Sequence, residues 1–174
     1  LTYSYSPDVM MGYADSVHSD ASSTVGWNFQ YSQAVVSWGS KKAKTISRSS
    51  LDSSIMATSE AAKEAAYLTN LINEIGFPLD SPMKLYISDT SVTERFYEPP
   101  HDKSRHIERR HGWLHELADS ARVEFPFISA PANMAAFFSG GIRRKQSFIY
   151  ARNRIMNIGS RIPDTRNGGV SQPH

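Results

Sequence analysis

Residues 38–76 read WGSKKAKTISRSSLDSSIMATSEAAKEAAYLTNLINEIG, and this stretch decides the fold. The pattern predicts the end of a strand, a basic turn and one long amphipathic helix. Ser49 and Ser50 can cap the start of the helix, and Asp52 lies in its first turn, where the helix dipole favours an acid. Gly76 ends the helix, and the proline two residues later prevents its resumption.

One face of this predicted helix is apolar or small, and we expect it to meet a sheet at close range. Its members recur at steps of three or four residues: Ser54, Ala57, Ala61, Ala65, Leu68, Ile72 and Ile75. Polar residues fall on the other faces, which we expect to meet water: Glu60, Lys63, Glu64, Asn70 and Asn73.

The composition indicates a globular domain. The chain has 174 residues, of which 40% are hydrophobic, including 8 Phe, 8 Tyr and 3 Trp, and this is enough to bury a core. No apolar run approaches the roughly 20 residues that span a bilayer, so we expect no membrane partner. No signal peptide is visible and Leu1 falls within a pattern, so we expect a piece of a longer protein.

The cysteine count and the charge limit the chemistry. With no cysteine the chain has no disulfide, no thiolate nucleophile and no cysteine-based zinc site. This fits an intracellular protein, and we expect a nuclear location. The net charge of +2 does not indicate nucleic-acid binding by itself, but basic residues cluster at 41–48, 103–110 and 143–154. Such clusters form either a solvated surface or a contact with nucleic acid.

The first half of the chain predicts antiparallel sheet. Residues 9–15 alternate, with Val9, Met11, Tyr13 and Asp15 on one face, and a polar loop follows at 16–23. Residues 25–31 and 34–38 read as two further strands, joined by a hairpin turn at Ser32-Gln33.

The second half predicts alternating strands and helices. Strands are expected at 83–88 and 123–128, the second irregular because of Pro126. Helices are expected at 89–96, 104–121, 132–138 and 146–158, and a disordered tail at 159–174. Together these elements predict one domain over residues 1–158, an α/β fold of the α+β kind with a five-stranded mixed sheet and flanking helices.

Several ordered blocks of sequence also carry a family resemblance. They are GYADS (12–16), SWGSKKAKTISRSS (37–50), MATSEAAKEA (56–65), LYISDTSV (85–92), SRHIERR (104–110) and IRRKQSF (142–148). In composition, order and spacing they resemble the ribonuclease H domain that closes the polyprotein of Ty1/copia-type retrotransposons. The resemblance covers residues 10–158 and implies a ribonuclease H-like fold, which agrees with the predicted order of elements.

The resemblance implies a definite chemistry. Hydrolysis of the RNA strand of an RNA–DNA hybrid in this family uses two magnesium ions, which activate a water and stabilise the leaving oxygen. Magnesium is a hard ion that prefers oxygen ligands, so the site needs several converging carboxylates. Carried over by position, the four acids fall on Asp15, Ser54, Ser88 and Ala136, and three of these carry no carboxylate.

Neighbouring acids and other residues offer few substitutes. Asp52 lies about 200° around the helix from Ser54 and is expected to point away from the sheet. Asp89 adjoins Ser88 and can replace it if the strand end shifts by one residue. His101, His106, His111 and His115 suggest a metal cluster, but HGWLH (111–115) lacks the acid of a zinc motif, so we expect exposed histidines and no metal.

Two functions remain open. The first is a catalytically inactive, retrotransposon-derived domain that binds another protein and needs no cofactor, with Phe96, Trp113 and Phe137-Phe138 available to the partner unless they pack in the core. The second is a nucleic-acid binder or residual magnesium-dependent ribonuclease H acting on RNA–DNA hybrids. Its contacts would come from six basic residues: Lys41, Lys42, Lys44, Arg48, Arg109 and Arg110.

Overall fold

A computed structural model describes residues 10–19, 22–43, 47, 49–79, 81–95, 105–140 and 145–158. Its centre is a five-stranded sheet in the order β3-β2-β1-β4-β5. Strands β1 (Met11–Val17), β2 (Thr24–Tyr31) and β3 (Ala34–Lys42) are antiparallel, whereas β4 (Met83–Ile87) runs parallel to β1 and β5 (Val123–Glu124) parallel to β4. The predicted mixed sheet is confirmed.

The hairpin between β2 and β3 has the turn that the sequence predicted. Ser32 and Gln33 both adopt positive φ angles, of 48° and 64°. Two consecutive residues in this region form the type of turn whose twist matches that of the two strands it joins. The hairpin therefore fixes the register of β2 against β3, in which Tyr31 pairs with Ala34.

The long helix α1 (Ser50–Glu74) follows the hairpin. The Ser49 hydroxyl accepts a hydrogen bond from the Asp52 backbone N–H at 3.1 Å, which satisfies one of the free donors of the first turn. Gly76, with φ of 87°, ends the helix in the left-handed region that glycine adopts without strain. Both ends of the helix are thus as predicted.

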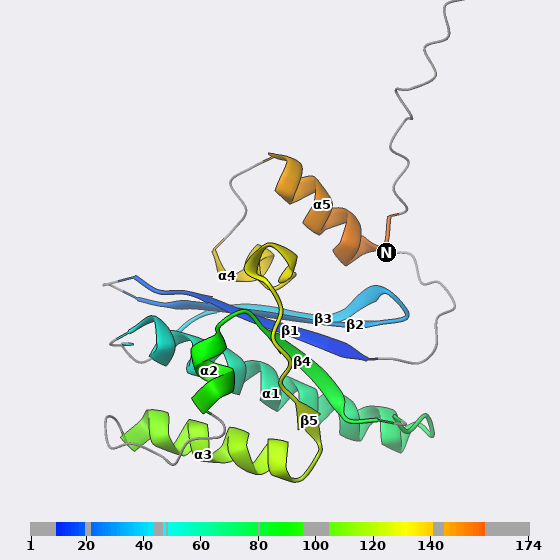
Figure 1. Cartoon of the computed structure of the whole chain (residues 1–174). Coiled ribbons are helices and arrows are strands. Elements are labelled where there is room, and N and C mark those ends of the chain that lie inside the picture. Colours follow the sequence, from blue (N-terminus) through cyan, green and yellow to red (C-terminus); the bar gives the residue numbers. More distant parts are fainter. Residues whose placement is uncertain are drawn as a thin grey trace, which may run out of the picture.

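The remaining helices cover the two faces of the sheet. They are α2 (Thr90–Arg95), α3 (Arg105–Asp119), the short 3-10 turn η1 (Ala130–Ala132), α4 (Ala136–Ser139) and α5 (Lys145–Met156). Figure 1 shows α1 against one face of the sheet with α3 beyond it, and α4 and α5 on the opposite face. No helix in the described part of the chain is long and apolar enough to cross a bilayer.

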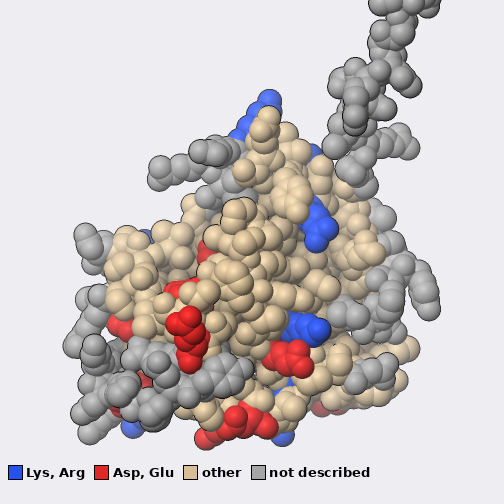
Figure 2. Space-filling view, viewed as in Figure 1, with Lys and Arg blue, Asp and Glu red and all other residues tan. Residues whose placement is uncertain are grey.

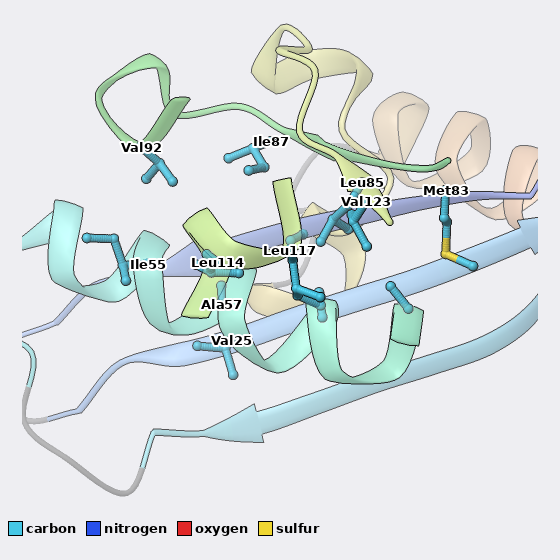
Figure 3. Packing of buried hydrophobic residues seen from close by; sticks show 14 of the residues in the cluster. Val25, Ile55, Ala57, Met83, Leu85, Ile87, Val92, Leu114, Leu117 and Val123 are labelled. Atoms are coloured by element: carbon cyan, nitrogen blue, oxygen red, sulfur yellow. The ribbon is translucent and has the colours of Figure 1, made fainter. Parts of the chain in front are cut away.

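The main core lies between the sheet and α1. Val25 and Phe29 of β2 and Leu85 of β4 are buried against Ile55 and Ala57 of α1. Figure 3 shows Leu114 and Leu117 of α3 closing the same cluster from the other side of α1. Small residues on α1, namely Ala57, Ala61, Ala62 and Ala65, let the helix lie close to the strands.

Charged side chains are dispersed on the face of the molecule that Figure 1 presents. In the space-filling view of that face, the visible lysines and arginines lie apart from one another, and some of them adjoin acidic residues (Figure 2). Among the coloured residues of this face, no continuous basic area is present.

Several predicted boundaries are wrong. The first strand begins at Met11 and continues through Ser16 and Val17, which were expected in a loop. Regular pairing of β5 ends at Glu124 because Pro126 has no N–H to donate, although Phe127 still forms an isolated bridge with Ile87. The helix expected at 132–138 is divided into η1 and α4 by Asn133. The predicted tail at 159–174 lies outside the described residues.

Two expectations for α1 are also wrong. Ile75 was placed on the core face but is exposed, because it lies at the C-terminal cap, past the last turn that reaches the core. Glu60 was expected to meet water, but only 16% of its side-chain surface is exposed.

Candidate functional site

The Asp15 carboxylate lies near the end of β1, on the sheet face that α4 covers. Ser88, directly after β4, donates a hydrogen bond from its hydroxyl to Asp15 Oδ1 at 3.4 Å. The Ser139 hydroxyl, in α4, donates to Asp15 Oδ2. Because β1 and β4 are parallel neighbours, their ends bring Asp15 and Ser88 to the same edge of the sheet.

Asn133 extends this arrangement. Its Nδ2 donates to the backbone oxygen of Ala14 at 2.8 Å and to Ser88 Oγ at 3.1 Å, and its Oδ1 accepts from the Ala135 N–H at 3.0 Å. Asn133 therefore ties the start of α4 to both central strands. We call Asp15, Ser88, Asn133 and Ser139 the Asp15 cluster.

A glycine in β2 permits the contact between α4 and Asp15. Gly26 is the cross-strand neighbour of Asp15, and a Cβ atom there would lie 2.5 Å from the Ser139 nitrogen and 2.6 Å from the Phe138 carbonyl carbon. Backbone at that distance cannot yield as a flexible side chain does. Only glycine lets α4 lie directly on β2 and place the Ser139 hydroxyl at Asp15.

The electrostatics of Asp15 reflect its burial. Loss of water around the carboxyl raises the pKa of Asp15 above its ordinary value. Hydrogen bonds from Ser139, the Ser16 backbone and Ser88 act in the opposite direction, because they favour the ionised carboxylate, but they do not cancel the effect of burial. Within the described residues no cation is among the causes of the shift.

The other acid positions implied by the resemblance lie around the same strand end. Ser54 of α1 faces the sheet, and its hydroxyl is 3.4 Å from that of Ser16, the residue after Asp15. Ala136 is the first residue of α4, one turn before Ser139. All four positions therefore surround the end of β1, with a carboxylate at one of them.

Asp89, the possible substitute for Ser88, bonds to the backbone at the start of α2. Its Oδ1 accepts a hydrogen bond from the Ser91 N–H at 3.0 Å, and its backbone oxygen accepts from the Val92 N–H at 3.2 Å. These contacts make Asp89 the cap of α2, while Ser88 occupies the place next to Asp15.

The donors around Asp15 fit a pair of magnesium ions poorly. Two such ions are held by several carboxylates that together offset their charge. The Asp15 cluster instead supplies one carboxylate, two hydroxyls and one amide, and these groups already bond to one another. Within the described ranges no three His, Cys, Asp or Glu side chains converge as a metal site requires.

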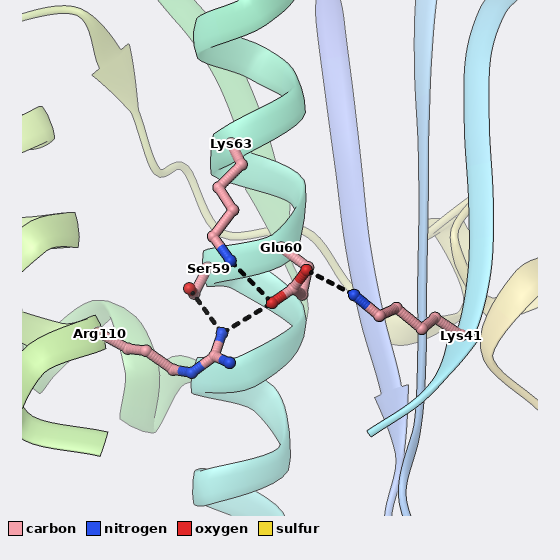
Figure 4. Close-up of polar contacts among 5 residues, drawn as sticks. All are labelled: Lys41, Ser59, Glu60, Lys63 and Arg110. Atoms are coloured by element: carbon pink, nitrogen blue, oxygen red, sulfur yellow. Dashed lines mark hydrogen bonds and ion pairs between the residues drawn. The ribbon is translucent and has the colours of Figure 1, made fainter. Parts of the chain in front are cut away.

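A second polar cluster surrounds Glu60 on α1 (Figure 4). Its carboxylate pairs with Arg110 of α3 at 2.9 Å, Lys63 at 3.0 Å and Lys41 of β3 at 3.1 Å. Arg110 also donates to the Ser59 hydroxyl at 2.9 Å. Hydrogen bonds from the three cations outweigh partial burial and lower the pKa of Glu60 to about 2. The Glu60 cluster thus joins β3, α1 and α3.

The basic residues predicted to bind nucleic acid fall into three groups. Lys41 and Arg110 are held by Glu60, whereas Lys42 and Arg109 are exposed. Lys44 and Arg48 lie outside the described residues. The structure therefore brings Lys41 and Arg110 together, but around an acid that offsets part of their charge.

The histidines and aromatic residues singled out from the sequence contact other residues of the fold where the structure describes them. His111 is buried, contrary to the expectation of exposure, and His115 Nδ1 lies 2.8 Å from Asp119 Oδ2. Trp113 is half-buried against the main core. The ring of Phe137 is 5.3 Å from those of Phe138 and Phe148. Neither His101 nor Phe96 belongs to the described residues, and the side chain of His106 is not among those described.

The sequence interpretation missed Ser139 and Asn133. Ser139 is 124 residues from Asp15 and Asn133 is 45 residues from Ser88, so no local pattern connects them. The carried-over acid position, Ala136, lies on the same short helix as Ser139. The side chain that reaches Asp15 lies one turn further along that helix.

Comparison with solved structures defines the fold class. The N-terminal RNase H domain of a Mycobacterium tuberculosis protein, solved as a fusion with maltose-binding protein, superposes with a TM-score of 0.58 at 10% identity, covering 84% of this chain and 97% of that one. RNase H1 from Halobacterium salinarum gives a TM-score of 0.54 at 15% identity, over 72% of this chain and 89% of that one. The chain has a ribonuclease H-like fold.

Sequence comparison places the chain more closely, although no family model matches it. It is 23% identical over 150 residues to the retrovirus-related Pol polyprotein of transposon TNT 1-94 from Nicotiana tabacum, covering 84% of the chain and 11% of the polyprotein. It is also 23% identical over 148 residues to that of transposon RE1 from Arabidopsis thaliana, covering 84% of the chain and 10% of the polyprotein. Its homologues are thus Pol polyproteins of copia-type transposons, and it spans about a tenth of their length.

A shorter match lies outside the polyproteins. Over 64 residues the chain is 39% identical to secreted RxLR effector protein 161 from Plasmopara viticola, covering 34% of the chain and 45% of that protein.

Proposed function

We propose that this chain is a retrotransposon-derived ribonuclease H-like domain that has lost hydrolytic activity and acts as a protein-interaction module within a larger protein. The observation that carries the proposal is the Asp15 cluster. A position that the family resemblance assigns to metal ligation holds a carboxylate bonded to two serine hydroxyls. In the described part of the chain, no group of three His, Cys, Asp or Glu side chains could hold a metal ion there.

The chemistry of the donor set supports loss of activity. A hydroxyl or an amide is a neutral ligand, so replacing three acids with Ser54, Ser88 and Ala136 removes about three negative charges from the site implied by the resemblance. One half-buried carboxylate cannot offset the charge of two divalent ions. A ribonuclease H that depends on such a pair would lack the groups that position its attacking water.

The preserved frame supports a retained role other than hydrolysis. The main core is closed, α1 is capped, and Gly26 still admits α4 to the sheet. A sequence that decays without selection is expected to lose core residues as readily as surface ones. Here the changes fall on the acid positions and spare the packing, which favours selection for the fold itself.

Nucleic-acid binding is the second candidate, favoured by the exposure of Lys42 and Arg109. Phosphate contacts from such residues can support binding without any catalytic acid. Against it, Glu60 holds Lys41 and Arg110 and offsets part of their charge. We therefore place this function second.

Two measurements on the purified chain separate these functions. Incubation with a labelled RNA–DNA hybrid in magnesium or manganese is expected to leave the hybrid intact, whereas metal-dependent cleavage that Asp15→Asn abolishes would contradict the proposal. Binding to hybrid, duplex and single strands is then measured against salt. Tight binding that weakens steeply with salt would favour the second candidate, and no binding at physiological salt would support a protein partner.

A further inference from the structure

The last turns of α1 carry an exposed apolar surface. Tyr67, Leu71 and Ile75 are 60%, 38% and 61% exposed, and Phe77, just beyond the helix, is 64% exposed. We call these four residues the α1 ridge. Single exposed apolar residues are ordinary on a protein surface, whereas a contiguous group marks a place where a partner can bind.

The ridge lies on a different face of α1 from the one that packs in the core. Tyr67, Leu71 and Ile75 follow one another at steps of four residues and therefore align along the helix. Leu68 is buried in the main core and Ile72 packs against it. The end of α1 is thus apolar on two faces, and a helix with that pattern is normally covered on both.

The charge at this end of α1 is negative. Glu74 is the one charged residue between residues 65 and 79, and the last turn contains no basic residue. The free carbonyl groups of a helix C-terminus add a partial negative charge, which a nearby cation would stabilise. Within the described residues Glu74 forms no ion pair, so the chain does not supply that cation in the part described.

The size of the ridge indicates the size of its occupant. Since a large apolar side chain covers about 150–250 Å², the exposed fractions amount to an area on the order of 450 Å². A stable interface between two globular proteins takes about 800 Å² from each partner. The ridge is too small to hold two copies of this chain together, but it suits one helix.

We propose that the α1 ridge binds an amphipathic helix of a partner protein, whose apolar face packs on the ridge while a lysine or arginine beside that face reaches Glu74 and the helix terminus. This inference rests on the proposed function as a protein-interaction module. Apart from the last carbonyl groups, the backbone groups of α1 are bonded within the helix, so a partner cannot add as a strand and must dock through side chains. A row of side chains at four-residue steps fits between the side-chain rows of another helix.

The test uses two synthetic amphipathic peptides that share a leucine face at helical spacing. One carries lysines beside that face and the other glutamates at the same positions. Fluorescence anisotropy of each labelled peptide is measured against the purified chain. We expect the lysine peptide to bind about tenfold or more tightly than the glutamate peptide, and Ile75→Ser combined with Phe77→Ser to weaken it by about tenfold or more.

Matched variants locate the interaction. Tyr150→Ser removes an aromatic residue of similar exposure from α5, on the opposite face of the sheet, and is expected to leave the affinity unchanged. Glu74→Gln is expected to reduce the difference in affinity between the lysine peptide and the glutamate peptide without abolishing binding. The ridge residues are exposed, so thermal unfolding of these variants should match that of the unchanged chain.

Three results would overturn the proposal. The first is equal affinity for the two peptides, and the second is a peptide affinity that the two ridge substitutions leave unchanged. The third is a dimer of the chain that those substitutions dissociate, because the occupant of the ridge would then be a second copy of the chain. Cleavage of the RNA–DNA hybrid would instead contradict the loss of activity, and it would leave the peptide affinities to decide the role of the ridge.

Discussion

Replacing Glu60 with glutamine tests how much the Glu60 cluster stabilises the fold. The three cations lower the pKa of Glu60 from 4.5 to about 2, and at about 1.36 kcal/mol for each pKa unit this difference sets an upper bound of about 3 kcal/mol. The side chains of Lys41 and Lys63 are 44% and 55% exposed, so solvent screens much of their attraction. We therefore expect Glu60→Gln to lower the free energy of unfolding by about 1–2 kcal/mol at pH 7.

The effect has a defined pH dependence. Because the pKa is lower in the folded chain, the ionised carboxylate contributes its full stabilisation above pH 4.5 and loses it as the pH falls from 4.5 towards 2. The difference between Glu60→Gln and the unchanged chain should therefore be largest at pH 7 and small near pH 2.5. Urea unfolding followed by circular dichroism at both pH values measures it.

Glu74→Gln is the matched control, since Glu74 also lies on α1 but is exposed. We expect it to change the free energy of unfolding by less than about 0.5 kcal/mol. A loss for Glu60→Gln no larger than that of the control, or one that persists undiminished at pH 2.5, would refute the electrostatic reasoning.

Four further substitutions test the packing and the cap of α1, each by thermal or urea unfolding. Gly26→Ala forces a Cβ into the backbone of α4 and should lower the free energy of unfolding by about 1–3 kcal/mol. Its control is Gly112→Ala on α3, where a Cβ meets no described atom within 4 Å, and this control should raise the free energy of unfolding by about 0.5–1 kcal/mol. Equal effects of the two substitutions would contradict the close approach of α4. Asn28 is fully buried, and its amide has no hydrogen-bond partner among the residues that the structure describes. Asn28→Leu should therefore stabilise the fold by about 1 kcal/mol, and a clear loss would show that the amide is bonded in solution. Ser49→Ala removes the cap of α1 and should cost about 1 kcal/mol, and no change would argue against the cap.

The parts of the fold that the sequence predicted are those that local rules control. Ser49 and Gly76 mark the ends of α1 because capping depends on a few neighbouring residues. The turn at Ser32-Gln33 follows from the break between two alternating runs. Pro126 also predicted an irregular β5, although not the residue at which its regular pairing ends. The break in helix at Asn133 depends on bonds to Ala14 and Ser88, far along the chain, so local patterns did not reveal it.

The candidate site likewise has parts that the sequence predicted and parts that it did not. The family resemblance pointed to Asp15 and Ser88, which the structure brings into contact. The Ser139 contact depends on how closely α4 approaches the sheet, which Gly26 controls from another strand. The surroundings of Glu60 likewise combine three elements, and helical periodicity alone placed this residue on a water-facing side.

Whether the Asp15 carboxylate can still hold a metal ion is tested most directly by titrating manganese into the isotope-labelled chain. Bound manganese broadens the amide signals of nearby residues, so Asp15, Ser16 and Ser88 report on the site. We predict that manganese at millimolar concentration causes no saturable broadening of these three signals, because the hydroxyls of Ser88 and Ser139 already bond to the Asp15 carboxylate. Saturable broadening of these signals that Asp15→Asn removes would show a metal site and contradict the loss of catalytic function.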